Sequence, residues 1–109
     1  MIGDVTMDIK EKMRINSLYD IYGELLTDKQ KEYFEYYYRQ DYSLSEIADI
    51  LSVSRNAVHM QLKNVVGYLE NYENKLKMLK SREKIDRIIE KIDSGYATIE
   101  EIKTELEKV

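Results

Sequence analysis

Cysteine, proline and tryptophan are absent from this sequence, and its 109 residues include only four glycines. The absence of cysteine excludes a disulfide framework and a thiolate metal site. The absence of proline, together with abundant Glu, Lys, Leu and Ile, lets helices run without interruption and favours an all-α fold. A chain of this length builds a modest core but no elaborate active site.

Long hydrophobic runs are missing as well. No apolar stretch approaches the roughly 20 residues that a membrane-spanning helix needs. No signal-peptide pattern opens the chain. We therefore expect a cytoplasmic protein without a membrane span.

Signatures of catalysis are also lacking. The only histidine, His59, has neither a cysteine nor a second histidine with which to share a metal ion. The chain has no glycine-rich phosphate loop, and no two carboxylates stand out from ordinary helix-surface acids. The sequence therefore predicts a non-catalytic protein that holds no metal and no cofactor, with His59 solvated on a helix.

Charge is distributed unevenly along the chain, whose net charge is −4. Residues 1–54 hold 6 basic and 11 acidic side chains, and residues 85–109 hold 4 basic and 7 acidic ones. Residues 55–84, in contrast, hold 7 basic and 3 acidic side chains, a local charge of +4. This positive segment is either a nucleic-acid footprint or a local excess on a solvated helix, and composition leaves both interpretations open.

Residues 43–58 have the pattern of a helix-turn-helix, which is the most informative feature of the chain. Ser43 or Ser45 caps a short helix whose inward residues include Ala48, small enough for a close helix crossing. Ser52 stands where the turn of this motif usually has glycine, and a left-handed serine there costs roughly 1 kcal/mol. Ser54 then caps the second helix.

Spacing and capping residues place the preceding helices. Apolar residues at helical spacing predict a first helix from about Asp8 to Leu26. Thr27 and Gln30 form a capping box that begins the next helix. This helix carries a run of aromatic residues that could stack on nucleic acid, but a shared helical face makes core packing the favoured interpretation. The predicted core members are Tyr33, Phe34, Tyr37 and Tyr38, whereas Tyr36 lies off the stripe and is expected to be exposed.

The second helix of the motif continues into a heptad pattern of seven apolar residues: Val58, Leu62, Val65, Leu69, Tyr72, Leu76 and Leu79. Such a stripe spans about 32 Å of helix, longer than a small helical head can cover. The stripe either seals the chain's own core or pairs two chains. We favour the interpretation in which part of it, together with the C-terminal hairpin, forms a dimer interface or an extended arm. The pattern fails at Glu83, which predicts a helix break near residues 80–82.

The C-terminal segment reads as a helical hairpin. Asp93–Tyr96 is a predicted turn with Gly95 in the left-handed conformation, and Thr98 with Glu101 forms a capping box. We therefore expect a helix-turn-helix domain with a long fourth helix over residues 1–80. Residues 81–109 form a hairpin that packs on the same chain or on a partner, and the protein is predicted to be a homodimer.

The outward residues of the second motif helix are the candidate binding site. In a helix-turn-helix this helix presents its first turns to base edges and phosphates. Arg can pair with guanine, Asn with adenine, and His or Lys with a base or a phosphate. The same tri-helical unit also serves as a protein-binding module, so both kinds of partner stay open. The candidate nucleic-acid contacts are Arg55, Asn56, His59, Met60 and Lys63.

At residues 26–38, 42–48 and 53–58 the chain resembles the YlxM family of small helical proteins from Gram-positive bacteria and mycoplasmas. The resemblance extends over nearly the full length, including residues 13–22 and 69–76. The motif itself is also similar to the promoter-reading C-terminal region of sigma factors.

This resemblance implies a regulatory, DNA-binding fold linked to the signal recognition particle pathway. It places the contacts at the same five residues of the second motif helix. Two mechanisms follow: binding of DNA or the particle's RNA through residues 55–84, or an adaptor that binds a protein of the particle or its receptor. In the adaptor mechanism the helix-turn-helix is scaffold only.

Overall fold

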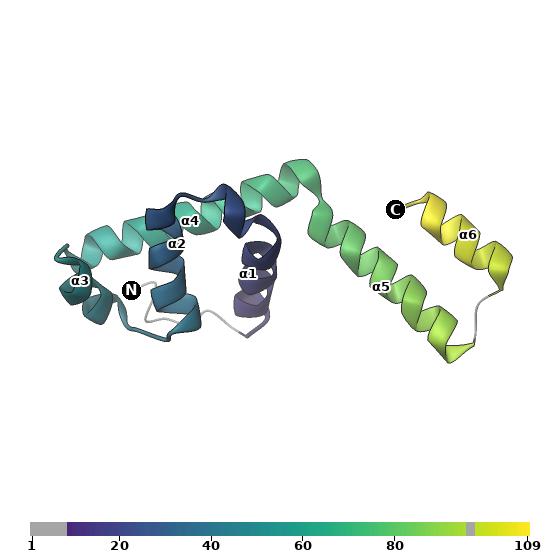
Figure 1. The fold of residues 1–109 in the computed structure, drawn as a ribbon, viewed down its shortest axis with the longest axis horizontal. Helices are drawn as coiled ribbons and strands as arrows, with labels where there is room; N and C mark the ends of the chain where they lie inside the picture. Colours follow the sequence, from purple (N-terminus) through teal and green to yellow (C-terminus); the bar gives the residue numbers. More distant parts are fainter. Residues whose placement is uncertain (1–8, 96–97) are drawn as a thin grey trace. The chain divides into compact units, whose positions relative to one another are not determined.

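The computed structural model describes residues 9–95 and 98–109, and every regular element in these residues is helical, which confirms the all-α prediction (Figure 1). The described residues form two compact units that divide between Lys75 and Leu76. The first unit contains α1 (Ile9–Tyr22), the 3-10 turn η2 (Gly23–Leu25), α2 (Asp28–Phe34), the π-turn η3 (Glu35–Arg39), α3 (Leu44–Leu51) and most of α4 (Arg55–Leu76). The second unit contains α5 (Met78–Ser94) and α6 (Ile99–Glu107).

Capping boxes begin three of the helices; those at Thr27 and Thr98 are predicted by the sequence, and the one at Ser43 adds Glu46 to a predicted cap. The Thr27 hydroxyl accepts a hydrogen bond from the Gln30 amide at 3.1 Å, and the Gln30 side chain accepts one from the Thr27 amide at 2.8 Å. The same reciprocal pair joins Ser43 to Glu46 at the start of α3, so Ser43 and not Ser45 is the cap. Thr98 and the residue three positions on repeat the arrangement before α6.

The first helix is shorter than predicted. It ends at Tyr22, and a 3-10 turn over Gly23–Leu25 follows in place of the last helical turn. A Cβ on Gly23 would lie 3.2 Å from the Tyr19 ring, so the missing side chain gives that ring its packing space. The predicted first residue, Asp8, lies outside the described residues.

The aromatic run ends in a π-turn that local sequence did not reveal. The Gln40 amide donates to the Glu35 carbonyl at 2.9 Å, and the Tyr42 amide donates to the Tyr36 carbonyl at 3.0 Å. This wider turn brings Tyr36 onto Tyr42, with ring centroids 5.5 Å apart. Tyr36 is therefore half-buried, and its predicted exposure is wrong because the prediction assumed regular α-helical spacing.

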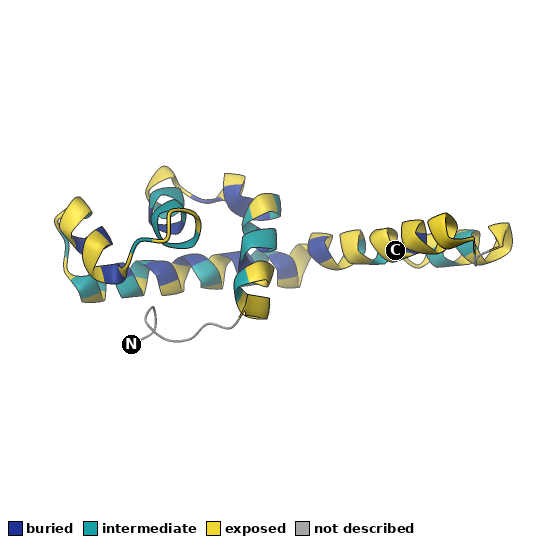
Figure 2. Ribbon diagram, turned by 90° about the horizontal axis from the view of Figure 1, so that it is seen from below, coloured by how far each residue is buried: buried dark blue, intermediate teal, exposed yellow. Residues whose placement is uncertain are grey.

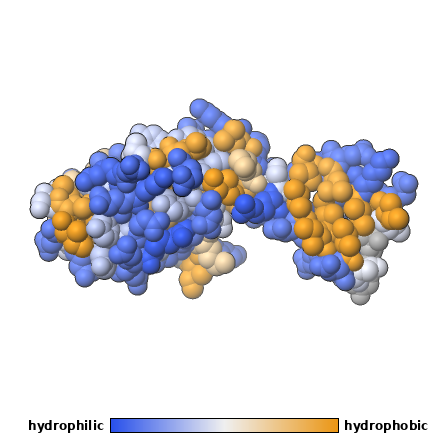
Figure 3. Space-filling model, viewed as in Figure 1, coloured by the Kyte–Doolittle hydropathy of each residue, from blue (hydrophilic) through white to orange (hydrophobic). Residues whose placement is uncertain are grey.

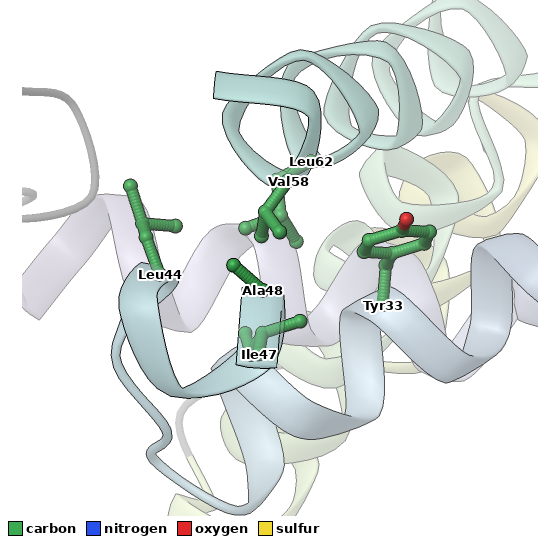
Figure 4. Packing of buried hydrophobic residues seen from close by; sticks show 6 residues of the cluster. All are labelled: Tyr33, Leu44, Ile47, Ala48, Val58 and Leu62. Carbon is green, nitrogen blue, oxygen red and sulfur yellow. The ribbon is translucent and has the colours of Figure 1, made fainter. Parts of the chain in front are cut away.

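The core of the first unit forms where α2, α3 and α4 meet. Tyr33 and Phe34 are buried, whereas Tyr37 and Tyr38 are half-buried and pack against the core rather than stand in solvent. The closely packed cluster shown in Figure 4 consists of Tyr33, Leu44, Ile47, Ala48, Val58 and Leu62. Core packing of the aromatic run is thus confirmed.

The heptad stripe of α4 seals the first unit over most of its length. Val58, Leu62, Val65 and Leu69 are buried along one side of the helix (Figure 2). The burial ends near Tyr72, and Leu76 is 54% exposed.

The helix then breaks at Lys77, which adopts a left-handed conformation with φ of 53°. Residues 80–82, where we expected the break, lie inside α5. The break therefore lies between the exposed Leu76 and the buried Leu79, ahead of Glu83 where the apolar pattern fails.

The second unit is a hairpin of α5 and α6. Gly95 ends α5 in the left-handed conformation with φ of 74°, as predicted, while Asp93 and Ser94 still belong to the helix. Tyr96, the last residue of the predicted turn, lies outside the described residues. Within this hairpin Leu79 and Ile88 of α5 are buried, and no residue of α6 is buried. Its two helices therefore bury little of their apolar surface against each other.

Candidate nucleic-acid interface

A helix-turn-helix forms from α3, the residues that follow it and the start of α4. Ser52 ends α3 in the left-handed conformation with φ of 56° and ψ of 45°. Its amide donates to the carbonyl of Ala48, a residue only 7% exposed. Serine thus adopts the backbone shape that glycine usually supplies in this turn.

Ser54 fixes the first turn of α4. Its hydroxyl accepts a hydrogen bond from the Ala57 amide at 3.0 Å, which satisfies one of the free amides at the helix start. Turn geometry and cap together determine where the first residues of α4 lie relative to α3.

The five predicted contact residues divide between two strips of α4. Asn56, Met60 and Lys63 are exposed and share the face opposite the buried stripe, since successive residues turn by about 100° around the helix. Arg55 and His59 are half-buried and lie at the edge of this face. The structure therefore brings three of the five together and sets two beside them.

The outward face of α4 extends beyond Lys63, the last contact residue that the sequence predicted. Asn64, Gly67, Asn71 and Asn74 are exposed and continue it at helical spacing. A Cβ on Gly67 would meet no atom within 4 Å, so packing in this chain does not explain the glycine. The alternating spacing of three and four residues that begins at Met60 is the signal that predicts these positions.

Acidic groups of α4 are turned away from this face or neutralised. The Arg14 guanidinium donates to both carboxylate oxygens of Glu70, at 2.8 and 3.1 Å. Glu73 is 8% exposed, and the Tyr22 hydroxyl donates to its Oε1 at 2.7 Å. Residues 55–69 contain no acid at all. The outward face of α4 therefore presents amide, thioether and ammonium groups without a competing carboxylate.

The positive segment of the sequence divides between the two units. Of its seven basic residues, only Arg55 and Lys63 lie in the first five turns of α4, and the other five fall in residues 75–84. Most of the local charge therefore belongs to α5 and the residues just before it, not to the motif helix.

The described residues contain neither a metal-binding cluster nor a membrane-spanning helix. Within residues 9–95 and 98–109, no group of three or more His, Cys, Asp or Glu side chains could hold a metal ion. None of the helices in the described part of the chain is long and apolar enough to cross a bilayer.

The fold and the exposed α4 face define a helix-turn-helix protein. The chain belongs to the family described as "Putative helix-turn-helix protein, YlxM / p13 like", which matches residues 9–109. This confirms the family resemblance read from the sequence.

Several relatives match over much of their length. The UPF0122 protein YofM of Lactococcus lactis is 38% identical over 94% of this chain and 93% of its own. A UPF0122 protein of Pediococcus pentosaceus is 45% identical over 89% of each chain. A third, from a Thermoanaerobacter species, is 48% identical over 77% of this chain and 72% of its own.

Proposed function

We propose that this protein is a non-catalytic regulator that binds DNA through the outward face of α4 and acts in the signal recognition particle pathway. The observation that carries the DNA contact is the acid-free, exposed face of Asn56, Met60 and Lys63 at the start of the second motif helix. Presentation of this helix to the major groove is the usual work of the motif.

The side chains of this face suit the chemistry of base edges. An Asn amide pairs with the N6 and N7 atoms of adenine, and an apolar side chain contacts the thymine methyl group. Asn56 and Met60 have these roles in the proposal. Lys63 contacts a phosphate or a base acceptor, while Arg55 and His59 contact the backbone from the edge of the face.

The assignment to the signal recognition particle pathway is supported by the family alone. The resemblance to YlxM proteins implies this pathway. We therefore propose the pathway as the setting of the nucleic-acid contact, with DNA as the ligand and the particle's RNA as the competing outcome.

An adaptor role is the second candidate, and a specific observation favours it. Ile50, Met60 and Tyr68 are each between 46% and 48% exposed, so α3 and α4 show apolar side chains that a partner protein could cover. The first five turns of α4 also contain only Arg55 and Lys63 as basic residues, fewer than phosphate binding usually uses. In this alternative the α3–α4 surface binds a protein of the particle or its receptor.

The test compares two double variants on the same helix. Duplexes selected from a random-sequence DNA pool and a pool of structured RNA are titrated by fluorescence anisotropy. Asn56→Ala with Lys63→Ala is expected to weaken DNA binding at least tenfold, since one base contact contributes about 1–3 kcal/mol. Asn74→Ala with Lys75→Ala changes the same residue types at the far end of α4, outside the first turns that hold the proposed contacts, and should leave affinity unchanged.

Other results would decide against DNA. Tight binding of the RNA pool alone would move the ligand to RNA at the same face. If neither pool binds, while a particle protein is retained by the wild-type chain and released by the Asn56 and Lys63 substitutions, the adaptor role replaces the proposal. Equal effects of both double variants would show that the first turns of α4 have no special part in binding.

A further inference from the structure

We infer that the exposed apolar face of the α5–α6 hairpin binds a second copy of this chain. Ile85, Ile89 and Ile92 follow one another at helical spacing on α5 and are 39%, 48% and 48% exposed. On α6, Ile99 is 85% and Leu106 50% exposed. Figure 3 shows the resulting hydrophobic surface over the α5–α6 unit.

The hairpin buries few apolar residues through its own contacts. It belongs to a unit of residues 76–109, and units below about 40 residues usually need a disulfide, a metal or association with another chain. The sequence contains no cysteine, and the described residues contain no metal-binding cluster. Leu79 and Ile88 are the buried residues of α5 and no residue of α6 is buried, so the apolar residues of the hairpin gain from further contact.

The charges of the hairpin point to a second copy as the occupant. The first half of α5 is basic, with Lys80, Arg82 and Lys84 against Glu83, whereas α6 holds four glutamates against Lys103. Among the described residues, no ion pair joins these α6 glutamates to α5. A two-fold dimer that sets α6 of one protomer against α5 of the other pairs these opposite charges twice.

A groove along the hairpin shows how the contact would be made. It has a volume of about 240 Å³, and Ile88 and Ile102 contribute apolar walls. Glu100, Glu101 and Glu105 also line it, with Lys91 as the one basic lining residue among the described residues. A lysine or arginine fits such a groove, because its aliphatic stem contacts apolar walls while its charged head reaches the carboxylates. The basic half of the partner's α5 supplies these side chains.

The dimer has a consequence for the basic residues of α5. When they face the partner's α6, they are neutralised and cannot serve as phosphate contacts. The dimer then carries two copies of the outward α4 face. The inference does not rest on the proposed function, since it uses only contacts and charges of the second unit.

The primary test is the mass of the full-length protein in solution. Sedimentation velocity at micromolar concentration should give twice the 13.0 kDa chain mass. Ile89→Glu should reduce the mass to that of one chain because it places a charge in the apolar contact. Ile50→Glu is the matched control, since Ile50 and Ile89 are both 48% exposed, and it should leave the dimer intact.

A charge-exchange experiment separates a lost contact from a lost fold. Arg82→Glu with Lys84→Glu makes both hairpin helices acidic, and Glu105→Lys with Glu107→Lys removes the acidic character of α6. Each variant alone should be monomeric, and an equimolar mixture should restore a dimer. A monomeric wild-type protein, a dimer that Ile89→Glu and Ile50→Glu affect equally, or a mixture that stays monomeric would overturn the inference.

Discussion

At the scale of single residues, Tyr22 and Glu73 define the end of the first unit's core. Their side chains are 1% and 8% exposed, and the hydrogen bond between them joins α1 to the last buried turn of α4. A carboxylate this deeply buried is costly unless its oxygens accept hydrogen bonds. The phenol of Tyr22 therefore supplies a hydrogen bond to a carboxyl group that packing removes from water.

Tyr22→Phe should lower the free energy of unfolding by about 1–3 kcal/mol, because it removes a donor from a buried carboxylate. Urea denaturation followed by circular dichroism measures the change. Tyr68→Phe removes the same hydroxyl from a ring that is 46% exposed and should change stability by less than about 0.5 kcal/mol. Equal losses in the two variants would mean that the buried pair contributes nothing particular.

Tyr38 should make the fold sensitive to alkali. Burial, followed by the nearby Tyr37 and Glu11, raises its pKa to about 12 from the ordinary 10.0. The folded protein thus holds the phenolic proton more tightly than the unfolded chain, so this contribution to stability is complete below pH 10 and is lost as pH rises toward 12. Urea midpoints should fall across this range, and Tyr38→Phe should make the fall smaller; an identical fall in both proteins would exclude the role of Tyr38.

At the scale of elements, the turn between α3 and α4 contains two serines with opposite effects. Ser52 has the left-handed conformation that strains an L-residue, whereas Ser54 caps α4 through its hydroxyl. The same residue type is therefore unfavourable at one position and favourable two positions later. This turn sets the placement of the candidate interface.

Ser52→Gly should raise the free energy of unfolding by about 1 kcal/mol, since glycine adopts this conformation without steric cost. Ser54→Ala should lower it by about 1 kcal/mol through loss of the cap. Chemical denaturation of both variants checks the pair. Changes of the same sign would show that one of the two geometries is not what determines stability.

The elements that sequence predicted best are those that depend on neighbouring residues alone. The capping boxes at Thr27 and Thr98 need a partner only three positions away, so the sequence predicts them directly, whereas at α3 it left the cap open between Ser43 and Ser45. The π-turn at Glu35–Arg39 depends instead on tertiary contacts, because Arg39 reaches Asp20 at 2.9 Å and Asn16 at 2.9 Å on α1. The spacing of apolar residues within the helix does not predict these contacts between Arg39 and α1, and so it does not predict the π-turn.

The candidate site was also predictable only in part: the positions of its residues on the helix were, but their long-range partners were not. Helical spacing places Asn56, Met60 and Lys63 on one face, and the structure leaves them exposed. The neutralisation of Glu70 by Arg14 joins residues 56 positions apart, which no local pattern encodes. The division of the positive segment at Lys75 likewise follows from where burial stops, not from the charges themselves.

At the scale of the whole molecule, the two units expose surfaces of different chemistry. The first unit presents an outward helix face with two basic residues at its start, and the second presents apolar and opposite-charge surface suited to a second copy. A protein of net charge −4 can then bind nucleic acid if the acids lie away from the contact. Such binding relies less on phosphate charge than that of a strongly basic protein.

The most direct test of the central claim is the salt dependence of DNA affinity. If Arg55 and Lys63 are the phosphate contacts, the logarithm of the affinity should fall against the logarithm of salt with a slope of about −2 for each bound α4, hence about −4 for a dimer that engages both. Lys63→Ala should make the slope shallower by about 1 for each bound helix. A slope that Lys63→Ala leaves unchanged would contradict DNA binding through the outward face of α4.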